Sequence, residues 1–135
     1  MAQFVLDCSV TISWFIPDEV NNNLILEQVA EKGAIVPSIW HLEVGNVLLN
    51  AQRKRRITQE QASSALYSLN VLPIITDNLT SKCAWQETME LAKYHSLSLY
   101  DASYLELAQR LNLPIATFDK QLQIAASKNN IVVIN

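Results

Sequence analysis

The stretch FVLDCSV, residues 4–10, decides the fold of this sequence, because an aspartate ends its apolar run. Phe4, Val5 and Leu6 have the composition of a short buried strand. Asp7 then lies where the strand leaves its sheet. An unpaired carboxylate is costly to bury, so Asp7 is either a residue of a turn or part of a site.

The rest of the chain alternates short strands with helices. We expect strands at residues 3–6, 34–36, 72–75, 114–117 and 131–134. Helices are expected at residues 9–15, 21–32, 37–55, 59–70, 80–94, 98–111 and 119–128. Strands separated by helices need crossover connections, which place helices on both faces of a parallel sheet. The sequence therefore predicts an α/β fold with three layers (α/β/α) and a central parallel sheet, as one domain over residues 1–135.

Several local signals mark the ends of these elements. Pro73 favours an edge position for the strand at 72–75, and Gly33 ends the helix before the strand at 34–36. Helix starts are predicted from capping residues, namely the capping boxes Thr58–Gln61 and Ser98–Asp101 and the N-caps Thr80 and Asp119.

Composition limits the possible functions. The net charge is −3, with 13 acids and 10 Lys or Arg residues, so the chain is not a globally basic nucleic-acid binder. No apolar run is long enough to span a membrane, and the start carries no secretory signal. We expect a cytoplasmic protein. Cys8 and Cys83 match no metal or redox spacing and are predicted to be free thiols.

Four acids are candidates for one site. Asp7 and Asp119 lie near the carboxyl ends of predicted strands, where open parallel sheets bind ligands. Glu43 falls on the margin of the apolar face of its helix, and Asp101 points along the inward stripe that contains Tyr104. Each has a simpler interpretation: Asp7 as a turn residue, Glu43 as a partner of Asn46, and Asp101 and Asp119 as capping residues.

Together the four acids favour a metal site. Carboxylates that converge repel one another and would bind protons unless a cation is present. Mg²⁺ or Mn²⁺ prefers oxygen ligands and keeps waters that a phosphate can displace. Neither histidine is placed as a ligand, and the sequence has no P-loop and no glycine-rich dinucleotide loop. An all-acid site indicates metal-assisted phosphoryl chemistry with one or two ions.

Two further features have less certain roles. The hydroxyls of Ser9 and Thr117 lie two residues from Asp7 and Asp119, so they can hold a carboxylate or a metal-bound water. The simpler alternatives are helix capping for Ser9 and strand propensity for Thr117, and for Ser9 we favour the site role. The run RKRR at residues 53–56, which contains Arg53, Lys54, Arg55 and Arg56, is either a phosphate-binding patch for RNA or a solvated helix end.

The sequence resembles the PIN-domain ribonucleases, in particular the VapC-like toxins of type II toxin–antitoxin pairs. The resemblance rests on four motifs in order, which extend over most of the chain: VLDCSV, PSIWHLEVGNVL, LSLYDASYLELAQ and LPIATFDKQL. It implies Mg²⁺- or Mn²⁺-dependent cleavage of RNA, a cognate antitoxin and a homodimer. It also implies the roles of the site residues, with Asp7, Glu43, Asp101 and Asp119 as catalytic metal ligands and Ser9, Asn46 and Thr117 in support.

The sequence leaves two alternatives to an endoribonuclease. A PIN-like module could bind RNA or protein without catalysis, although all four acids are present. A haloacid-dehalogenase-type phosphatase needs a second acid two residues after the first, and Ser9 occupies that position. Lys120 stands where some PIN members carry a further acid, which bears on occupancy of a second metal position.

Overall fold

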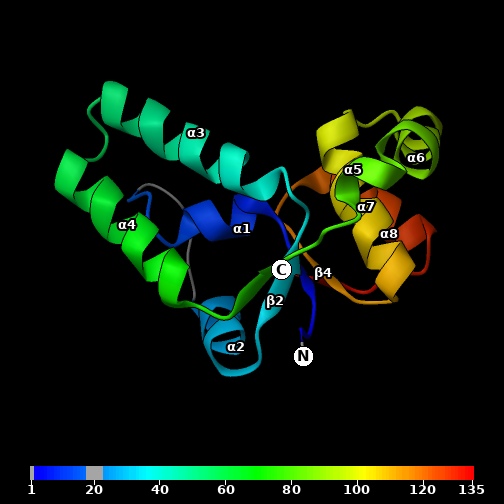
Figure 1. Cartoon of the computed structure of the whole chain (residues 1–135), viewed down its shortest axis with the longest axis horizontal. Coiled ribbons are helices and arrows are strands. Elements are labelled where there is room, and N and C mark those ends of the chain that lie inside the picture. Colours follow the sequence, from blue (N-terminus) through cyan, green and yellow to red (C-terminus); the bar gives the residue numbers. More distant parts are fainter. Residues whose placement is uncertain (1, 18–22) are drawn as a thin grey trace.

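The computed structural model describes residues 2–17 and 23–135. A five-stranded sheet forms its centre, in the order β3–β2–β1–β4–β5, and every adjacent pair of strands is parallel (Figure 1). The strands are β1 (Val5–Leu6), β2 (Ala34–Val36), β3 (Ile74–Thr76), β4 (Ile115–Ala116) and β5 (Val133–Ile134). The predicted parallel sheet is confirmed, and β3 is an edge strand as expected.

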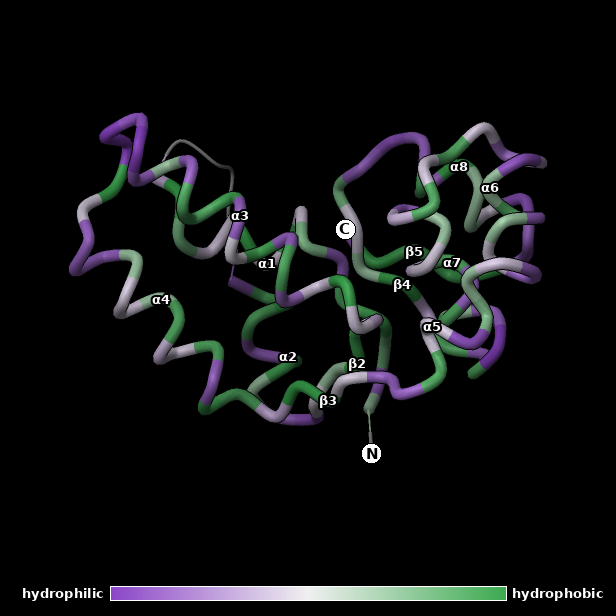
Figure 2. The backbone as a smooth tube through the Cα atoms, turned by 45° about the horizontal axis from the view of Figure 1, so that its top comes forward, coloured by the Kyte–Doolittle hydropathy of each residue, from purple (hydrophilic) through white to green (hydrophobic). Residues whose placement is uncertain are grey.

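Helices cover both faces of the sheet, which confirms the three-layer fold. One layer contains α1 (Cys8–Ser13), α2 (Leu24–Lys32), α3 (Trp40–Arg53) and α4 (Gln59–Val71) (Figures 1 and 2). The other contains α5 (Thr80–Cys83), the π-helical turn η1 (Ala84–Thr88), α6 (Met89–His95), α7 (Leu99–Leu111) and α8 (Lys120–Lys128). The first two residues of the helix predicted at 21–32 lie outside the described residues.

The predicted helix signals have mixed outcomes. Thr58 and Gln61 form the full capping box, with hydrogen bonds of 3.1 and 2.8 Å. Gly33 ends α2 with a φ of 84°, a conformation that glycine adopts at low cost. The prediction for Thr80 is wrong: it lies inside the first turn of α5, and its hydroxyl donates to Asp77 instead of capping the helix.

The core is apolar and includes one helix that is enclosed along most of its middle. Val5 and Leu6 of β1 are fully buried between the two helical layers, and the strands carry the hydrophobic colours of Figure 2. Every residue of α7 from Ala102 to Ala108 is buried. Helix α7 therefore holds its polar side chains at fixed positions beside the sheet, because its rotation would expose core residues.

The direction in which the chain adds strands to the sheet reverses between β1 and β4. From β1, the chain builds β2 and β3 on one side, and then crosses to build β4 and β5 on the other. In open parallel sheets, ligands bind beyond the carboxyl ends of the two strands at such a switch point. Asp7 follows β1 and Thr117 follows β4, so the fold brings both residues to this position.

Two smaller expectations can be compared with the structure. Cys8 and Cys83 are both free, as predicted; Cys8 is buried and Cys83 is half-buried. Within the described ranges, no helix combines the length and the apolar character that a membrane span requires.

Candidate functional site

Asp7 is held by hydroxyl groups at the carboxyl end of β1. Its side chain is buried, with 5% exposed. Ser9 Oγ donates to Asp7 Oδ2 at 2.6 Å, and Thr117 Oγ1 donates to the same oxygen at 2.8 Å. The sequence predicted supporting roles for both hydroxyls. The structure places both on Asp7, one from the start of α1 and one from the end of β4.

The backbone that follows β4 fixes the direction of these hydrogen bonds. The Phe118 N–H donates to Ser9 Oγ and the Asp119 N–H donates to Thr117 Oγ1, each at 3.0 Å. Each hydroxyl oxygen thus accepts one hydrogen bond from the backbone and can point its proton at Asp7. A carboxylate that accepts two hydrogen bonds of this kind is stabilised in its ionised form.

Glu43 enters the same region from the first turn of α3. Its partner is Tyr104 of α7, whose hydroxyl donates to Glu43 Oε1 at 2.5 Å. This contact replaces the simpler interpretation in which Glu43 pairs with Asn46. Asn46 lies three residues further along α3 and is exposed. Its supporting role stays a prediction from the resemblance.

Asp101 and Asp119 lie at the starts of two helices. The Asp101 N–H donates to Ser98 Oγ at 3.0 Å, which forms one half of the predicted capping box. The half-buried Asp101 carboxylate is within electrostatic range of Asp119 and Asp7. Asp119 Oδ1 accepts a hydrogen bond from the Leu122 N–H at 3.1 Å. Asp119 is therefore the N-cap of α8 as predicted, and this bond occupies one side of its carboxylate.

The four acids influence one another electrostatically. Burial raises the pKa of Asp7, the hydrogen bonds from Ser9 and Thr117 oppose this rise, and the charge of Asp119 adds to it.

The pKa values of Glu43 and Asp101 are raised by the same causes. Burial raises the pKa of Glu43, the Tyr104 hydroxyl opposes the rise, and the charges of Asp7 and Asp101 increase it. Burial raises the pKa of Asp101, and the charges of Asp119 and Asp7 raise it further. The structure thus brings all four predicted acids into one electrostatic cluster, and each of these three carboxyl groups favours its protonated form more than in water.

Another buried acid at a strand end has a different environment. Asp77 follows β3, and Arg110 of α7 binds both of its oxygens at 3.1 and 2.8 Å. Arg110 also pairs with Glu106 at 2.8 Å. Although burial acts to raise it, hydrogen bonds from Arg110 and Thr80 hold the pKa of Asp77 below its usual value. Sequence reasoning missed this network, which joins residues 33 positions apart.

None of the four site acids forms an ion pair with Lys or Arg among the residues that the structure describes. The ion pairs found within the described ranges are those that Arg110 makes with Asp77 and Glu106. Asp7 and Glu43 are held by hydroxyl donors, which orient a carboxylate without neutralising its charge. The negative charge of the cluster therefore remains available for a cation from solution.

The donor set fits a hard divalent cation. All four side chains offer carboxylate oxygens, which Mg²⁺ and Mn²⁺ prefer. A cation would relieve the mutual repulsion that, together with burial, raises the pKa values of Asp7, Glu43 and Asp101. Within residues 2–17 and 23–135, no three acid, His or Cys side chains already stand close enough to share one ion. An ion at this site would therefore be held by one or two of the carboxylates, with waters as its remaining ligands.

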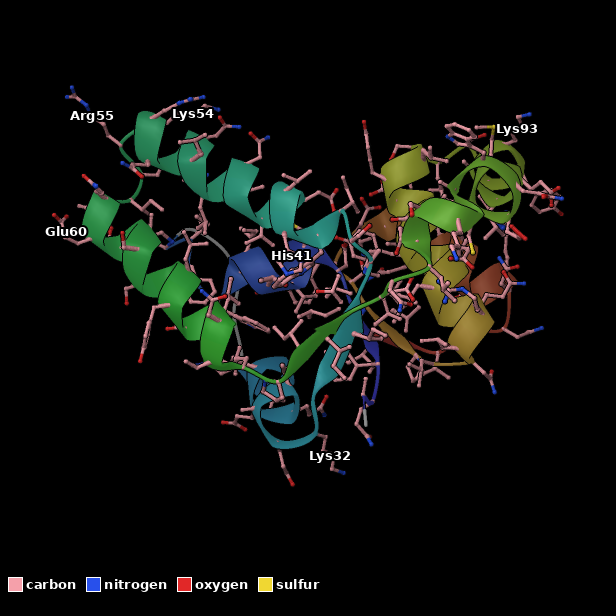
Figure 3. The ribbon with its side chains drawn as sticks, viewed as in Figure 1. Lys32, His41, Lys54, Arg55, Glu60 and Lys93 are labelled. Atoms are coloured by element: carbon pink, nitrogen blue, oxygen red, sulfur yellow. The ribbon has the colours of Figure 1, made fainter. Side chains whose placement is uncertain are left out.

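The basic run at residues 53–56 lies at the far end of α3. Glu43 is in the first turn of this helix and Lys54 is its C-cap, so about 16 Å of helix separates them at 1.5 Å per residue. Figure 3 shows Lys54 and Arg55 projecting outward at the end of α3 that is remote from α7. The structure does not place this run beside the acids, and an RNA-binding role for it stays a prediction.

Comparisons with known proteins agree with this architecture. A family model of the PIN domain matches residues 4–128. Ribonuclease VapC1 of Mycobacterium tuberculosis is 27% identical over 130 residues, which cover 93% of this chain and 92% of that protein.

Solved structures share the fold at low sequence identity. PAE2754 from Pyrobaculum aerophilum is similar with a TM-score of 0.72 and 21% identity, and the match covers 98% of this chain and 83% of that one. VapBC2 from Rickettsia felis, bound to a DNA fragment from their promoter, is similar with a TM-score of 0.68 and 18% identity over 98% of this chain and 97% of that one.

Proposed function

Because this chain belongs to the PIN-domain family, we propose that it is a metal-dependent endoribonuclease that cleaves RNA phosphodiesters. The observation that carries the proposal is the cluster of four acids at the β1–β4 switch point, held by hydroxyls and capping contacts instead of cationic side chains. The similarity to Ribonuclease VapC1 supports RNA as the substrate.

Each acid has a distinct place in the proposed mechanism. Asp7 and Asp101 are the main ligands for Mg²⁺ or Mn²⁺, and Glu43 and Asp119 complete the acidic pocket with room for one or two ions. Such an ion supplies activation of the attacking water and stabilisation of the charge that develops on the phosphate. The protein contributes fixed carboxylate positions: Ser9 and Thr117 hold Asp7, and the N-cap bond to Leu122 restricts Asp119.

A cleavage assay tests the proposed function against both alternatives. Purified protein is incubated with a folded RNA, with Mn²⁺ or with EDTA, beside the variant Asp7→Asn. The proposal expects internal cleavage that needs Mn²⁺ and is lost in the variant. RNA binding without cleavage would instead indicate a PIN-like binding module. Release of inorganic phosphate from a phosphomonoester, without internal cuts, would indicate the phosphatase alternative.

We also propose an antitoxin as the protein partner of this chain, and the chain itself as the toxin of the pair. The support is the similarity to VapC1 and the resemblance of the four sequence motifs to VapC-like toxins. Co-expression with the protein encoded by a short neighbouring reading frame tests this proposal. A stable complex that suppresses RNA cleavage is the expected result, and unchanged cleavage in its presence would contradict it.

A homodimer is the second expected assembly. Exposed apolar side chains support an association surface near the acids: Leu42 of α3 and Tyr100 of α7 are 72% and 60% exposed and line the same surface pocket. Sedimentation velocity measures the assembly directly. A monomer at concentrations of about 10–100 μM, well above those at which specific dimers usually form, would contradict it.

A further inference from the structure

Tyr104 places a hydroxyl group inside the acidic cluster. The residue is fully buried in the middle of α7, three positions after Asp101 on the same helix. The sequence pattern explains it as a member of the inward apolar stripe, and that role is confirmed by its burial. A leucine or phenylalanine would satisfy the stripe equally well, so packing does not explain the hydroxyl.

The hydroxyl has a specific partner. It donates to Glu43 Oε1 at 2.5 Å, across 61 positions of the chain. A buried hydroxyl needs a partner, and this one joins α7, which carries Asp101, to α3, which carries Glu43. The two helices belong to opposite layers of the fold (Figure 1). The hydrogen bond therefore fixes one site acid relative to another.

The type of donor also distinguishes Glu43 from the structural acids. Arg110 forms ion pairs with Asp77 and Glu106, whereas Tyr104 holds Glu43 with a neutral group, as Ser9 and Thr117 hold Asp7. A neutral donor restricts the orientation of a carboxylate and preserves its charge. Partners of this kind orient metal ligands in proteins, and their loss typically weakens metal binding or activity by about 10–100-fold.

We propose that Tyr104 is a positioning residue, whose hydroxyl holds the Glu43 carboxylate in the orientation in which it meets a divalent cation. This inference rests on the proposed function, because it requires a metal at the four acids. It gives a role to a residue of the third motif for which the resemblance implies none, and it explains why a tyrosine occupies a fully enclosed position of α7.

The test measures Mn²⁺ binding to the intact protein and the variant Tyr104→Phe. This change removes one oxygen and preserves the ring. Thermal melting is recorded over a series of Mn²⁺ concentrations, and bound Mn²⁺ is counted independently by electron paramagnetic resonance well below the melting temperature. We expect the variant to need about tenfold more Mn²⁺ for half-saturation. The matched control is Leu107→Val, a buried change on the same helix, which lowers the melting temperature and leaves the Mn²⁺ midpoint unchanged.

A double-mutant cycle identifies the residue through which Tyr104 acts. In a Glu43→Ala background, removal of the Tyr104 hydroxyl is expected to have no further effect on the Mn²⁺ midpoint. An equal effect in both backgrounds would overturn the assignment to Glu43. If the wild type binds Mn²⁺ and Tyr104→Phe reaches half-saturation at the same Mn²⁺ concentration, the inference is overturned and the proposed function stands. A wild type that binds no Mn²⁺ overturns both.

Discussion

Thr117 Oγ1 donates a hydrogen bond of 2.8 Å to Asp7 Oδ2, although 110 positions of sequence separate the two residues. Thr117 follows β4 and Asp7 follows β1, and these strands are paired with Leu6 opposite Ala116. The bond is therefore a direct consequence of the strand order. It is also the point at which the sheet determines the chemistry of the site, because it restricts the buried carboxylate.

Thr117→Val tests this bond by replacing a buried hydroxyl with a methyl group. Asp7 loses one donor and the Asp119 N–H loses its acceptor, so we expect a destabilisation of about 1–3 kcal/mol and a loss of Mn²⁺-dependent cleavage of about 10–100-fold. Chemical denaturation and an RNA cleavage assay measure the two effects.

Thr88→Val is the matched control for that change. Thr88 is equally buried, but its Oγ1 has no hydrogen-bond partner within residues 2–17 and 23–135. Its replacement removes an unsatisfied polar atom, so the variant should be as stable as the wild type or more stable, with normal cleavage. Equal losses of stability in the two variants would show that Thr117 contributes only through packing.

Asp101→Asn separates a metal ligand from a capping residue. If Asp101 acts only through the helix dipole, the variant loses roughly 0.3–1 kcal/mol and no activity. If it is a ligand, removal of its charge relieves repulsion with the neighbouring acids. We then expect the variant to melt at or above the wild type in EDTA, to lose most of the stabilisation by Mn²⁺, and to lose most cleavage. An active variant that melts lower in EDTA and keeps its Mn²⁺ shift would contradict the assignment.

The effect of this substitution on stability should depend on pH. Because the pKa of Asp101 is raised in the folded state, the folded protein binds this proton more tightly than the unfolded chain, where an aspartate titrates near about 3.9. Below that pH Asp101 is protonated in both the folded and the unfolded state, so its titration does not change the free energy of unfolding. As pH rises above it, ionisation increasingly destabilises the folded state. The melting temperature of Asp101→Asn minus that of the wild type, in EDTA, should therefore increase with pH.

For Asp77→Asn we expect the opposite dependence of stability on pH. The pKa of Asp77 is lowered by its partners, so its ionised form stabilises the folded state above the unfolded value, and this contribution disappears as pH falls. The variant should be destabilised most near neutral pH. If the stability of both variants relative to the wild type changed with pH in the same direction, the two acids would not have the different environments that the structure shows.

The basic run on α3 can be tested by replacing Arg53 and Arg55 with glutamine. If these exposed side chains bind phosphates, RNA binding should weaken, and the slope of log affinity against log salt should flatten by about 0.7 for each lost contact with single-stranded RNA. Both positions are exposed, so the melting temperature should not change. The control replaces Lys32 and Lys128, which lie at the ends of α2 and α8. An unchanged salt slope would indicate that the run is a solvated helix end.

The proposed toxin role predicts a growth defect. Expression of the chain alone should slow bacterial growth, and Asp7→Asn should relieve the effect, because the buried carboxylate is proposed as a main metal ligand. Growth curves with immunoblots, which confirm equal protein levels, measure this. Equal growth of cells that express the wild type and the variant would count against a toxin.

Local sequence signals predicted the strands and the acids well. The apolar run before Asp7 and the strand–helix alternation are local features, and they sufficed for the parallel sheet and for the placement of Asp7 and Asp119 at strand ends. Asp77 also follows a strand, and nothing near it in the sequence indicates that Arg110 neutralises it. Distinguishing a site acid from a structural acid thus required contacts between distant segments.

The same limitation applies to helices. The segment predicted as one helix from Thr80 contains a π-helical turn at Ala84–Thr88, which packs against α7. The sequence periodicity alone favours a regular helix there. The bond between Tyr104 and Glu43 likewise joins two helices whose separate patterns show only that each has an inward face. Sequence periodicity identifies such faces, and tertiary structure decides which polar atoms meet across them.

The strand order has a consequence for the timing of synthesis. β1 pairs on one side with β2, which follows it closely in the chain, and on the other side with β4, whose first residue is Ile115. At about 5–20 residues per second, a ribosome takes roughly 5–20 s to reach β4 after β1. During this interval one edge of β1 lacks its partner and Asp7 lacks the Thr117 hydroxyl. A nascent chain therefore exposes an open strand edge, which favours aggregation, and gains its complete set of acids only after Asp119 has been synthesised.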